Sequence, residues 1–216
     1  MLVPDPLQTQ TKEHNYRFNI RQERKKKSDQ LNIAETIWVD GKLIDRPKNL
    51  TVSYGVLLYK YEDGEHKYLL GKIPQGNSWT VFKGLPEDSE TPDQTAIREF
   101  TEETSIPFPF EDFSKCKETK LFGRTSNKLL EINLVKAPEN FSIATFDVDN
   151  VVKIDSGYMK GKPEIVEIQF LTKKQAVGGT PSKNKLVKVY ASQVGILDHA
   201  QDFLEGQEQM KADESN

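Results

Sequence analysis

Glutamates and one arginine recur at regular spacing in the segment from Gly84 to Ile106. On a helix each residue advances the side chains by about 100°, so Glu99, Glu102 and Glu103 would fall on one face. Three carboxylates so close together repel one another, and a bound cation relieves that repulsion. Mg²⁺ suits such a site because it prefers oxygen ligands and shares its coordination with substrate phosphates. The spacing therefore predicts a Mg²⁺ site able to activate water and polarise a phosphoryl oxygen, as hydrolysis of a diphosphate linkage requires.

The residues before this predicted helix add further candidates. Glu90 stands just before the helix and Arg98 lies two turns into it, so an Arg–carboxylate contact would hold the preceding loop against the helix. Gly84 opens that loop, where the missing Cβ lets a backbone carbonyl approach a metal or a phosphate. Lys83 immediately precedes it and is placed to meet a substrate phosphate.

The full spacing, Gly-x5-Glu-x7-Arg-Glu-x2-Glu-Glu-x2-aliphatic, resembles the signature of the Nudix (MutT-like) hydrolases, and we call residues 84–106 the acidic box. The preceding Phe82-Lys83-Gly84 is similar to the usual Pro-Lys-Gly, with Phe82 in place of proline. Six fixed residue types would coincide by chance about once in 10⁵ chains of this length. One position departs from the pattern, because Ser105 stands where the family has glycine. A serine in a left-handed helix cap costs about 1 kcal/mol, but it replaces no ligand.

The resemblance implies an α/β fold, an α/β/α sandwich with a mixed β-sheet between helices, in which the acidic box forms a loop–helix–loop. It implies a set of catalytic residues: Glu102, Glu103, Arg98 and Glu90. It also implies a set of metal ligands: Glu99, Glu102, Glu103 and the carbonyl of Gly84. The implied cofactor is Mg²⁺, with Mn²⁺ able to replace it.

The family frequently uses one more carboxylate, downstream of the box, as a base or a further metal ligand. Glu164 and Glu131 are the candidates for this base, with Glu167 as a third, and a solvated surface role is the alternative for each. For the substrate, the expected contacts are Lys83 with phosphate and Trp79 or Phe122 with a nucleobase. The remaining aromatic residues lie mostly in predicted strands and are expected in the core.

The helix of the acidic box is the best-marked element of the chain. Thr91 is a suitable N-cap, Pro92 occupies the first helical position, and Gln94 completes a capping box. The helix should end near Thr104, before Pro107.

Other patterns predict the elements around this helix. Strands are expected at 36–42, 52–59, 66–73, 79–82, 119–122, 128–135 and 164–171. A long loop is expected at 138–160 and a closing helix at 187–204. The predicted organisation is a polar N-terminal extension at 1–30, a Nudix hydrolase domain at 31–205, and a polar, frayed C-terminal tail at 206–216.

Composition limits the class of protein. The 216 residues suffice for one domain, and 36% hydrophobic with 29% charged residues indicate a rather polar globular chain. No apolar run approaches the ~20 residues needed to span a bilayer, so no membrane partner is expected. A single cysteine, Cys116, and a first segment without the apolar core of a secretory signal favour a reducing, cytoplasmic location. The oligomeric state is left open.

These observations leave three functions. The first is Mg²⁺-dependent hydrolysis of a nucleoside diphosphate derivative, with Phe122 hinting at a dinucleoside polyphosphate. The second is a catalytically silent module that senses a nucleotide, although a sensor has no need to keep every acidic ligand. The third is an RNA-end decapping hydrolase, which rests on the basic stretch from Arg21 to Lys27. The net charge of −3 argues against a general nucleic-acid binder without excluding this local contact.

Overall fold

A long central strand organises the sheet. The computed structural model describes residues 36–39, 42–45, 51–76, 78–125, 128–178, 181–182, 185–186 and 188–214. Within these ranges β3 (Thr51–Glu62) is buried over most of its length. Its apolar run Val52 to Tyr59 reads as a strand covered on both faces, and that is how it packs. The predicted extension at 1–30, with its basic stretch, lies outside the described residues.

Two neighbours flank β3 on one edge and one on the other. Tyr54 of β3 pairs with Gly84 of β6 in the antiparallel sense and with Glu131 of β8 in the parallel sense. Because one residue pairs with both, β6 and β8 must lie on opposite edges of β3. The antiparallel β4 joins β3 on the β6 side, through a turn in which Asp63 and Gly64 both have positive φ.

The remaining strands complete a mixed, eight-stranded sheet. The bounds of its strands are β4 (Glu65–Lys72), β5 (Ser78–Thr80), β6 (Phe82–Gly84), β7 (Lys117–Arg124), β8 (Lys128–Lys136), β9 (Glu167–Thr172) and β12 (Lys188–Val189). Two separate hairpins are β1 (Thr36–Val39) with β2 (Lys42–Asp45), and β10 (Pro181–Ser182) with β11 (Lys185–Leu186).

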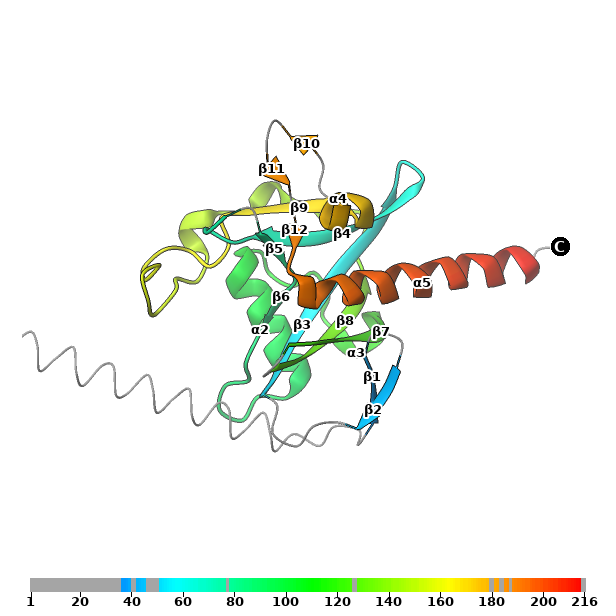
Figure 1. Cartoon of the computed structure of the whole chain (residues 1–216), viewed down its shortest axis with the longest axis horizontal. Coiled ribbons are helices and arrows are strands. Elements are labelled where there is room, and N and C mark those ends of the chain that lie inside the picture. Colours follow the sequence, from blue (N-terminus) through cyan, green and yellow to red (C-terminus); the bar gives the residue numbers. More distant parts are fainter. Residues whose placement is uncertain are drawn as a thin grey trace, which may run out of the picture.

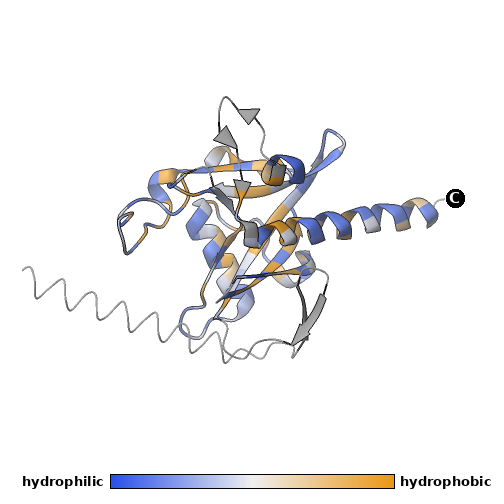
Figure 2. Cartoon of the chain, viewed as in Figure 1, coloured by the Kyte–Doolittle hydropathy of each residue, from blue (hydrophilic) through white to orange (hydrophobic). Residues whose placement is uncertain are grey.

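Helices cover both faces of this sheet (Figure 1). α2 (Pro92–Thr104) packs on one face, where Phe82 and Phe100 belong to one buried cluster. α5 (Ala191–Glu214) packs on the other, where Ile196 and Leu197 belong to a second cluster. The strands of the sheet carry many hydrophobic residues, whereas the free end of α5 is largely hydrophilic (Figure 2). The predicted α/β/α sandwich is therefore confirmed.

Short helices occupy the connections. They are α3 (Phe113–Cys116), α4 (Lys173–Gly178) and the 3-10 turns η1 (Ile143–Thr145) and η2 (Val148–Asn150). Both 3-10 turns lie in the long loop predicted at 138–160. No helix within the described ranges combines the length and the apolar character needed to cross a bilayer.

The closing helix differs from its prediction at both ends. It begins at Ala191 because Lys188 and Val189 pair with β5 instead. It continues to Glu214, so the prediction of a frayed tail after residue 205 was wrong. The reason is local: residues 205–214 contain no proline and are rich in good helix formers. Figure 1 shows this end of α5 extending past the sheet.

The strand predicted at 79–82 is split in two. Between β5 and β6, the Val81 N–H donates to Oε1 of Gln193 at 2.9 Å. The same buried amide donates from Nε2 to Oγ1 of Thr80 at 2.9 Å. This side chain of α5 therefore satisfies the buried N–H of Val81. Val81 lies where the chain passes from β5, which pairs with β4, to β6, which pairs with β3.

Candidate active site

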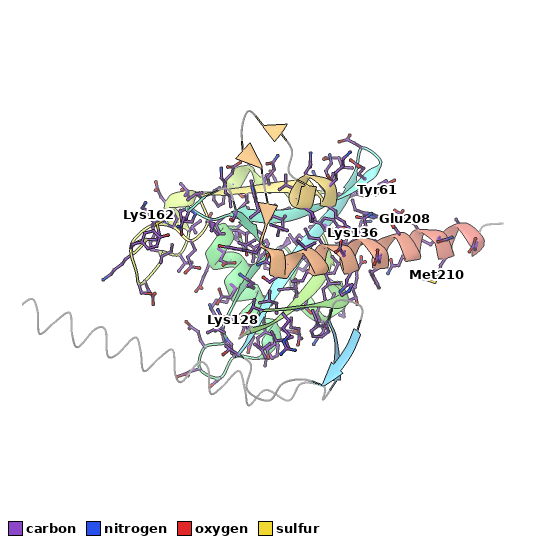
Figure 3. The ribbon with its side chains drawn as sticks, viewed as in Figure 1. Tyr61, Lys128, Lys136, Lys162, Glu208 and Met210 are labelled. Carbon is purple, nitrogen blue, oxygen red and sulfur yellow. The ribbon has the colours of Figure 1, made fainter. Side chains whose placement is uncertain are left out.

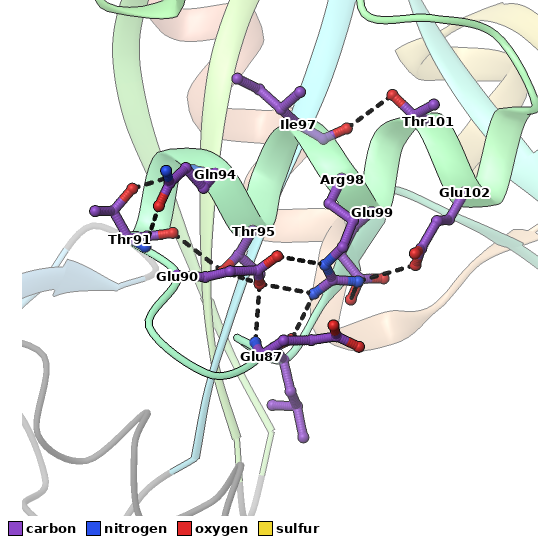
Figure 4. Close-up of polar contacts among 11 residues, drawn as sticks. Glu87, Glu90, Thr91, Gln94, Thr95, Ile97, Arg98, Glu99, Thr101 and Glu102 are labelled. Atoms are coloured by element: carbon purple, nitrogen blue, oxygen red, sulfur yellow. Dashed lines mark hydrogen bonds and ion pairs between the residues drawn. The ribbon is translucent and has the colours of Figure 1, made fainter.

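The helix of the acidic box begins as its sequence predicts. The backbone N–H of Gln94 donates to Oγ1 of Thr91 at 3.2 Å, and the N–H of Thr91 donates to Oε1 of Gln94 at 2.9 Å (Figure 4). Pro92 stands in the first turn, where its missing N–H costs no hydrogen bond. Ala96 and Phe100 then face the core, with Phe100 edge-on to Phe82 at 5.6 Å between ring centroids. This packing leaves the carboxylates along one edge of α2.

The loop before α2 is held by Arg98. Its Nε donates to Oε1 of Glu90 at 2.7 Å, and its Nη2 donates to Oε2 of Glu90 at 3.0 Å and to the carbonyl of Leu85 at 2.9 Å. Burial disfavours the charge on Glu90, but the hydrogen bonds from Arg98, the Glu87 N–H and Thr95, together with the charge of Arg98, lower the pKa of Glu90. The structure thus brings together the predicted Glu90–Arg98 contact.

The same guanidinium also reaches two predicted metal ligands. Its Nη1 lies 2.8 Å from Oε1 of Glu99 and 2.9 Å from Oε2 of Glu102 (Figure 4). Within the described part of the chain, no three acidic, histidine or cysteine side chains are gathered into a ready metal cage. Arg98 thus supplies a positive charge to both carboxylates. A metal at Glu99 and Glu102 must therefore replace the contacts of Nη1.

The loop and the helix meet most closely at Gly84. A Cβ built on Gly84 would lie only 1.9 Å from Oε1 of Glu99, so glycine alone leaves room for this carboxylate. Next to it, the Lys83 N–H donates to Oε2 of Glu103 at 2.8 Å. Two carboxylates and a backbone segment thus converge, and an all-oxygen set of this kind fits a hard ion such as Mg²⁺.

Burial changes the titration of these carboxylates. It raises the pKa of Glu99 from 4.5 to about 7, although the neighbouring Arg98 acts in the opposite direction. It also raises the pKa of Glu103, which is only 4% exposed, against the opposing charge of Lys83. Holding both groups ionised at neutral pH therefore costs free energy that a bound cation would recover.

Among the candidate bases, the structure brings Glu164 to the box. The Val152 N–H donates to the carbonyl of Glu102 at 2.9 Å, and the Glu164 N–H donates to the carbonyl of Val152 at 2.9 Å. The charge of Glu164 contributes to the raised pKa values of both Glu99 and Glu103. Burial also raises the pKa of Glu164 itself, against the opposing charge of Lys83.

The other two candidate bases lie elsewhere. Glu131 is 2% exposed and its Oε1 is 2.5 Å from Nζ of Lys120. It stands on β8, and so on the opposite edge of β3 from Gly84. Glu167 pairs with Lys72 at 3.1 Å on the edge of the sheet. The described contacts therefore pair Glu131 with Lys120 and Glu167 with Lys72, whereas Glu164 is joined to the acidic box through Val152.

The two aromatic residues predicted to meet a nucleobase are also placed away from the box. Trp79 is 2% exposed and belongs to the cluster under α5, on the face of the sheet opposite α2. Its predicted stacking role was wrong, because β5 turns the ring into the core. Phe122 is half-buried on β7, and β8 and β3 separate it from β6. Of the predicted substrate contacts, only Lys83 stands beside the box carboxylates.

Ser105, the departure from the family pattern, has a compensating contact. It closes α2 with φ 57° and ψ 8°, a left-handed conformation that favours glycine. Its Oγ accepts a hydrogen bond from the N–H of Asp147 at 2.8 Å, which ties the long loop to the end of α2. A glycine has no hydroxyl to accept this bond. Serine at this position therefore strains the backbone but anchors the long loop.

We therefore expect Ser105→Ala to lower the free energy of unfolding by about 1 kcal/mol, because alanine keeps the strained φ and loses the hydrogen bond. Ser105→Gly should be close to neutral, since the relief of backbone strain offsets the lost bond. Urea denaturation of the two variants measures the difference. Equal stability of Ser105→Ala and the unmodified protein would show that the Asp147 contact contributes nothing.

Comparison with known proteins is consistent with this geometry. Residues 50–191, more than half of the chain, match the family model described as NUDIX domain. The chain belongs to the NUDIX family. Its NUDIX domain contains the whole acidic box, and the prediction of a hydrolase acting on acid anhydrides in phosphorus-containing compounds is confirmed. No curated protein matches the sequence.

Several solved structures are similar to this NUDIX domain. A binary complex of a C. elegans Ap4A hydrolase is 20% identical with a TM-score of 0.47, over 72% of this chain and 98% of that one. The NUDIX domain of Shewanella oneidensis NrtR complexed with ADP ribose is 12% identical with a TM-score of 0.44, over 71% and 87%. RenU, a Nudix hydrolase from M. smegmatis, is 14% identical with a TM-score of 0.48, over 79% and 89%. Similarities this distant do not discriminate between substrates.

Proposed function

We propose that this NUDIX domain hydrolyses the diphosphate linkage of a nucleoside diphosphate derivative with the aid of Mg²⁺. The observation that carries the proposal is the placement of Glu99 and Glu103. Both carboxylates are buried with raised pKa values, and Gly84 leaves no room for a Cβ beside Glu99. Buried acids without a cation destabilise a fold, so their presence here supports a metal-binding role.

The residues of the acidic box fit such an ion. Mg²⁺ would be held by the carboxylates of Glu99, Glu102 and Glu103 with the carbonyl of Gly84, and Mn²⁺ could take its place. When bound, the ion would lower the pKa of a water molecule and neutralise negative charge on the phosphoryl oxygens. Glu90 and Arg98 hold the loop against α2, so that Gly84 stays against Glu99.

Glu164 is our candidate for the general base. It enters the site from outside the box, and its pKa is raised by burial. A base works best when its pKa is near the working pH, so this shift favours proton uptake from an attacking water. Lys83 carries the positive charge nearest to Glu103 and Glu164, and we expect it to bind a substrate phosphate.

The alternatives differ in what they need from the chain. A nucleotide sensor would bind substrate without turnover. A decapping hydrolase would use the basic stretch from Arg21 to Lys27, which lies outside the described residues. The hint toward a dinucleoside polyphosphate rested on Phe122, which the structure places away from the box, so that substrate is one option among several. A cytoplasmic location remains our proposal from the free Cys116.

The test is charge-neutral substitution assayed with Mg²⁺ on dinucleoside polyphosphates, nucleotide sugars, ADP-ribose, NADH, oxidised dNTPs and capped RNA. Glu99→Gln should lower turnover more than about 100-fold, since even residues that only support a metal ligand cost 10–100-fold. Glu164→Gln should lower kcat by about 10²–10⁴-fold and leave Mg²⁺ affinity unchanged, as expected of a base. Glu167→Gln is the matched control, because that carboxylate pairs with Lys72 at the sheet edge.

Three outcomes would contradict the proposal or favour an alternative. Unchanged turnover in Glu99→Gln would exclude a metal site built on this residue. Tight nucleotide binding without any turnover by the unmodified protein would favour the sensor. Capped RNA as the preferred substrate, with loss of RNA affinity on deletion of residues 1–30, would favour the decapping hydrolase.

A further inference from the structure

One residue at the corner between β5 and β6 belongs to neither strand. β5 pairs with β4 and β6 pairs with β3, so the chain changes neighbours at Val81. Val81 is fully buried and stands outside both pairings, so its N–H must find a partner elsewhere in the protein. The corner leads directly into Lys83 and Gly84, which contact the carboxylates of α2.

The side chain of Gln193 closes this corner from α5. Its Oε1 accepts the N–H of Val81 and its Nε2 donates to Oγ1 of Thr80, both at 2.9 Å. The Thr80 hydroxyl in turn donates to the carbonyl of Val81 at 3.1 Å. Both polar side chains are buried, and together they bond to both backbone groups of Val81. We call Thr80, Val81 and Gln193 the corner brace.

The start of α5 is itself fixed against β5. The short strand β12, just before the helix, pairs with β5 in the parallel sense. The N–H of Tyr190 donates to the carbonyl of Trp79 at 3.2 Å, and the N–H of Gln193 donates to the carbonyl of Tyr190 at 2.8 Å. The brace therefore lies at the first turn of α5, whereas the outer part of the helix, which carries Glu208 and Met210, extends past the sheet (Figure 3).

The strand that follows the corner is short and closely packed. β6 contains only the residues Phe82–Gly84. A Cβ on Gly55 of β3 would collide with the carbonyl of Phe82, which shows how closely the two backbones pass. A strand of three residues held in this way cannot absorb a shift at Val81 by bending. Such a shift would therefore be carried to the other end of β6.

That other end contacts two carboxylates of the acidic box. The Lys83 N–H donates to Oε2 of Glu103 at 2.8 Å. Gly84 lies against Glu99 and leaves no room for a Cβ. Val81 is two residues from the first contact and three from the second, which is about 7 and 10 Å along a strand. The corner brace is thus connected to the box through a few residues of backbone.

We propose that Gln193 is a positioning residue for the acidic box, because it holds the corner from which β6 enters the site. It fixes β6 so that the contacts of Lys83 and Gly84 with the box carboxylates are kept. The proposal rests on the proposed function, since those carboxylates are the proposed metal ligands. Groups that orient metal ligands typically change metal affinity or activity about 10–100-fold when they are removed. Here the orienting group acts from α5, across the sheet from α2.

Gln193→Met tests this role, because methionine keeps the length of the side chain and removes both hydrogen bonds. Mg²⁺ titrated calorimetrically into this variant should bind about tenfold more weakly than to the unmodified protein. In the metal-free protein, hydrogen exchange of the Lys83 amide should accelerate relative to the amides of β8, because its contact with Glu103 loosens. Gln193→Glu should restore both readouts, since a carboxyl group still offers one oxygen to Val81 and the other to Thr80.

Two further variants keep the test independent of stability. Leu204→Ala is the matched control: Leu204 is buried on the same helix, about 16 Å along its axis from Gln193. This variant should lose stability but keep the Mg²⁺ affinity and the relative exchange of Lys83. Thr80→Val removes the hydroxyl that orients the Gln193 amide and should weaken Mg²⁺ binding as well. Combined with Gln193→Met it should add little, because both act through one contact.

Unchanged Mg²⁺ affinity in both Gln193→Met and Thr80→Val would overturn the proposal, as would an equal loss of affinity in Leu204→Ala. If Gln193→Met does not fold, Thr80→Val alone decides the outcome. Failure of the proposed function has a different signature, namely turnover that survives Glu99→Gln. The exchange of the Lys83 amide needs no metal, so the two hypotheses can fail separately.

Discussion

Glu103→Gln is expected to raise the melting temperature of the metal-free protein while it removes Mg²⁺-dependent hydrolysis. Glu103 is almost fully buried with a raised pKa, and its Oε2 accepts the N–H of Lys83 at 2.8 Å. A glutamine keeps this acceptor and removes the buried charge. We expect the metal-free protein to gain about 0.5–2 kcal/mol of stability, the usual effect of one stabilising substitution, because the buried charge is removed. Turnover should fall more than about 100-fold, because a metal ligand is lost.

Calorimetry with and without Mg²⁺ checks both halves of this prediction. Mg²⁺ should raise the melting temperature of the unmodified protein strongly. Glu103→Gln should melt at a higher temperature without Mg²⁺ and gain little when Mg²⁺ is added. Ligand that binds only the folded state stabilises by mass action, so loss of that gain reports loss of the site. A variant that is less stable than the unmodified protein without metal would show that the Glu103 charge is already compensated by other groups.

The pH dependence of stability follows from the same burial. The pKa of Glu99 is about 7 in the folded state and 4.5 when unperturbed, so between these values the folded state binds more protons than the unfolded state. The free energy of unfolding therefore falls as pH rises through this window. The metal-free protein should melt higher at about pH 6 than at about pH 8. Glu103→Gln should reduce this difference, since the raised pKa of Glu103 has the same sign.

Gly84→Ala is expected to leave the fold intact and to lower kcat/KM about 100-fold, the cost of displacing a catalytic group by about 1 Å. The added Cβ would lie 1.9 Å from Oε1 and 2.2 Å from Oε2 of Glu99. Because this carboxylate is the end of a flexible side chain, it can move aside at little cost in stability. Gly84 is also not among the residues with positive φ, so alanine fits its backbone. The substitution should therefore displace the Glu99 carboxylate and leave the stability of the fold nearly unchanged.

Gly206→Ala is the matched control for this change. Gly206 lies in α5, and a Cβ there meets nothing within 4 Å. The variant should keep full activity and gain about 0.5–1 kcal/mol, because alanine favours the helix. Thermal melts, Mg²⁺ titrations and kcat/KM of the two variants separate the effects. Full activity in Gly84→Ala would show that the contact between Gly84 and Glu99 does not position the ligand.

The acidic box could be predicted almost completely because its determinants are local. The cap formed by Thr91 and Gln94, the carboxylate face of α2 and the contact between Glu90 and Arg98 all join residues a few positions apart. Helical periodicity and capping chemistry act over that range, so one sequence is enough to place them. The continuous apolar run of β3 likewise predicted a strand buried on both faces.

Residues outside the box could not be assigned this way. Glu131 and Glu164 are both acids downstream of the box, and only the strand order separates them. Glu131 falls on the edge of β3 opposite Gly84, while hydrogen bonds through Val152 bring Glu164 to Glu102. Nothing in the local sequence distinguishes these outcomes. The Glu102–Val152–Glu164 connection has no sequence pattern of its own.

The sequence by itself was enough to predict the metal ligands, the bond class and the helix that carries the carboxylates, since these depend on spacing along a single element. The tertiary structure decided which distant groups join them. It turned Trp79 into the core under α5 and brought Glu164 to the box. The physical reason is that strand order and the packing of long loops depend on contacts between segments far apart in the chain. Each of those contacts is fixed only when the whole sheet has formed.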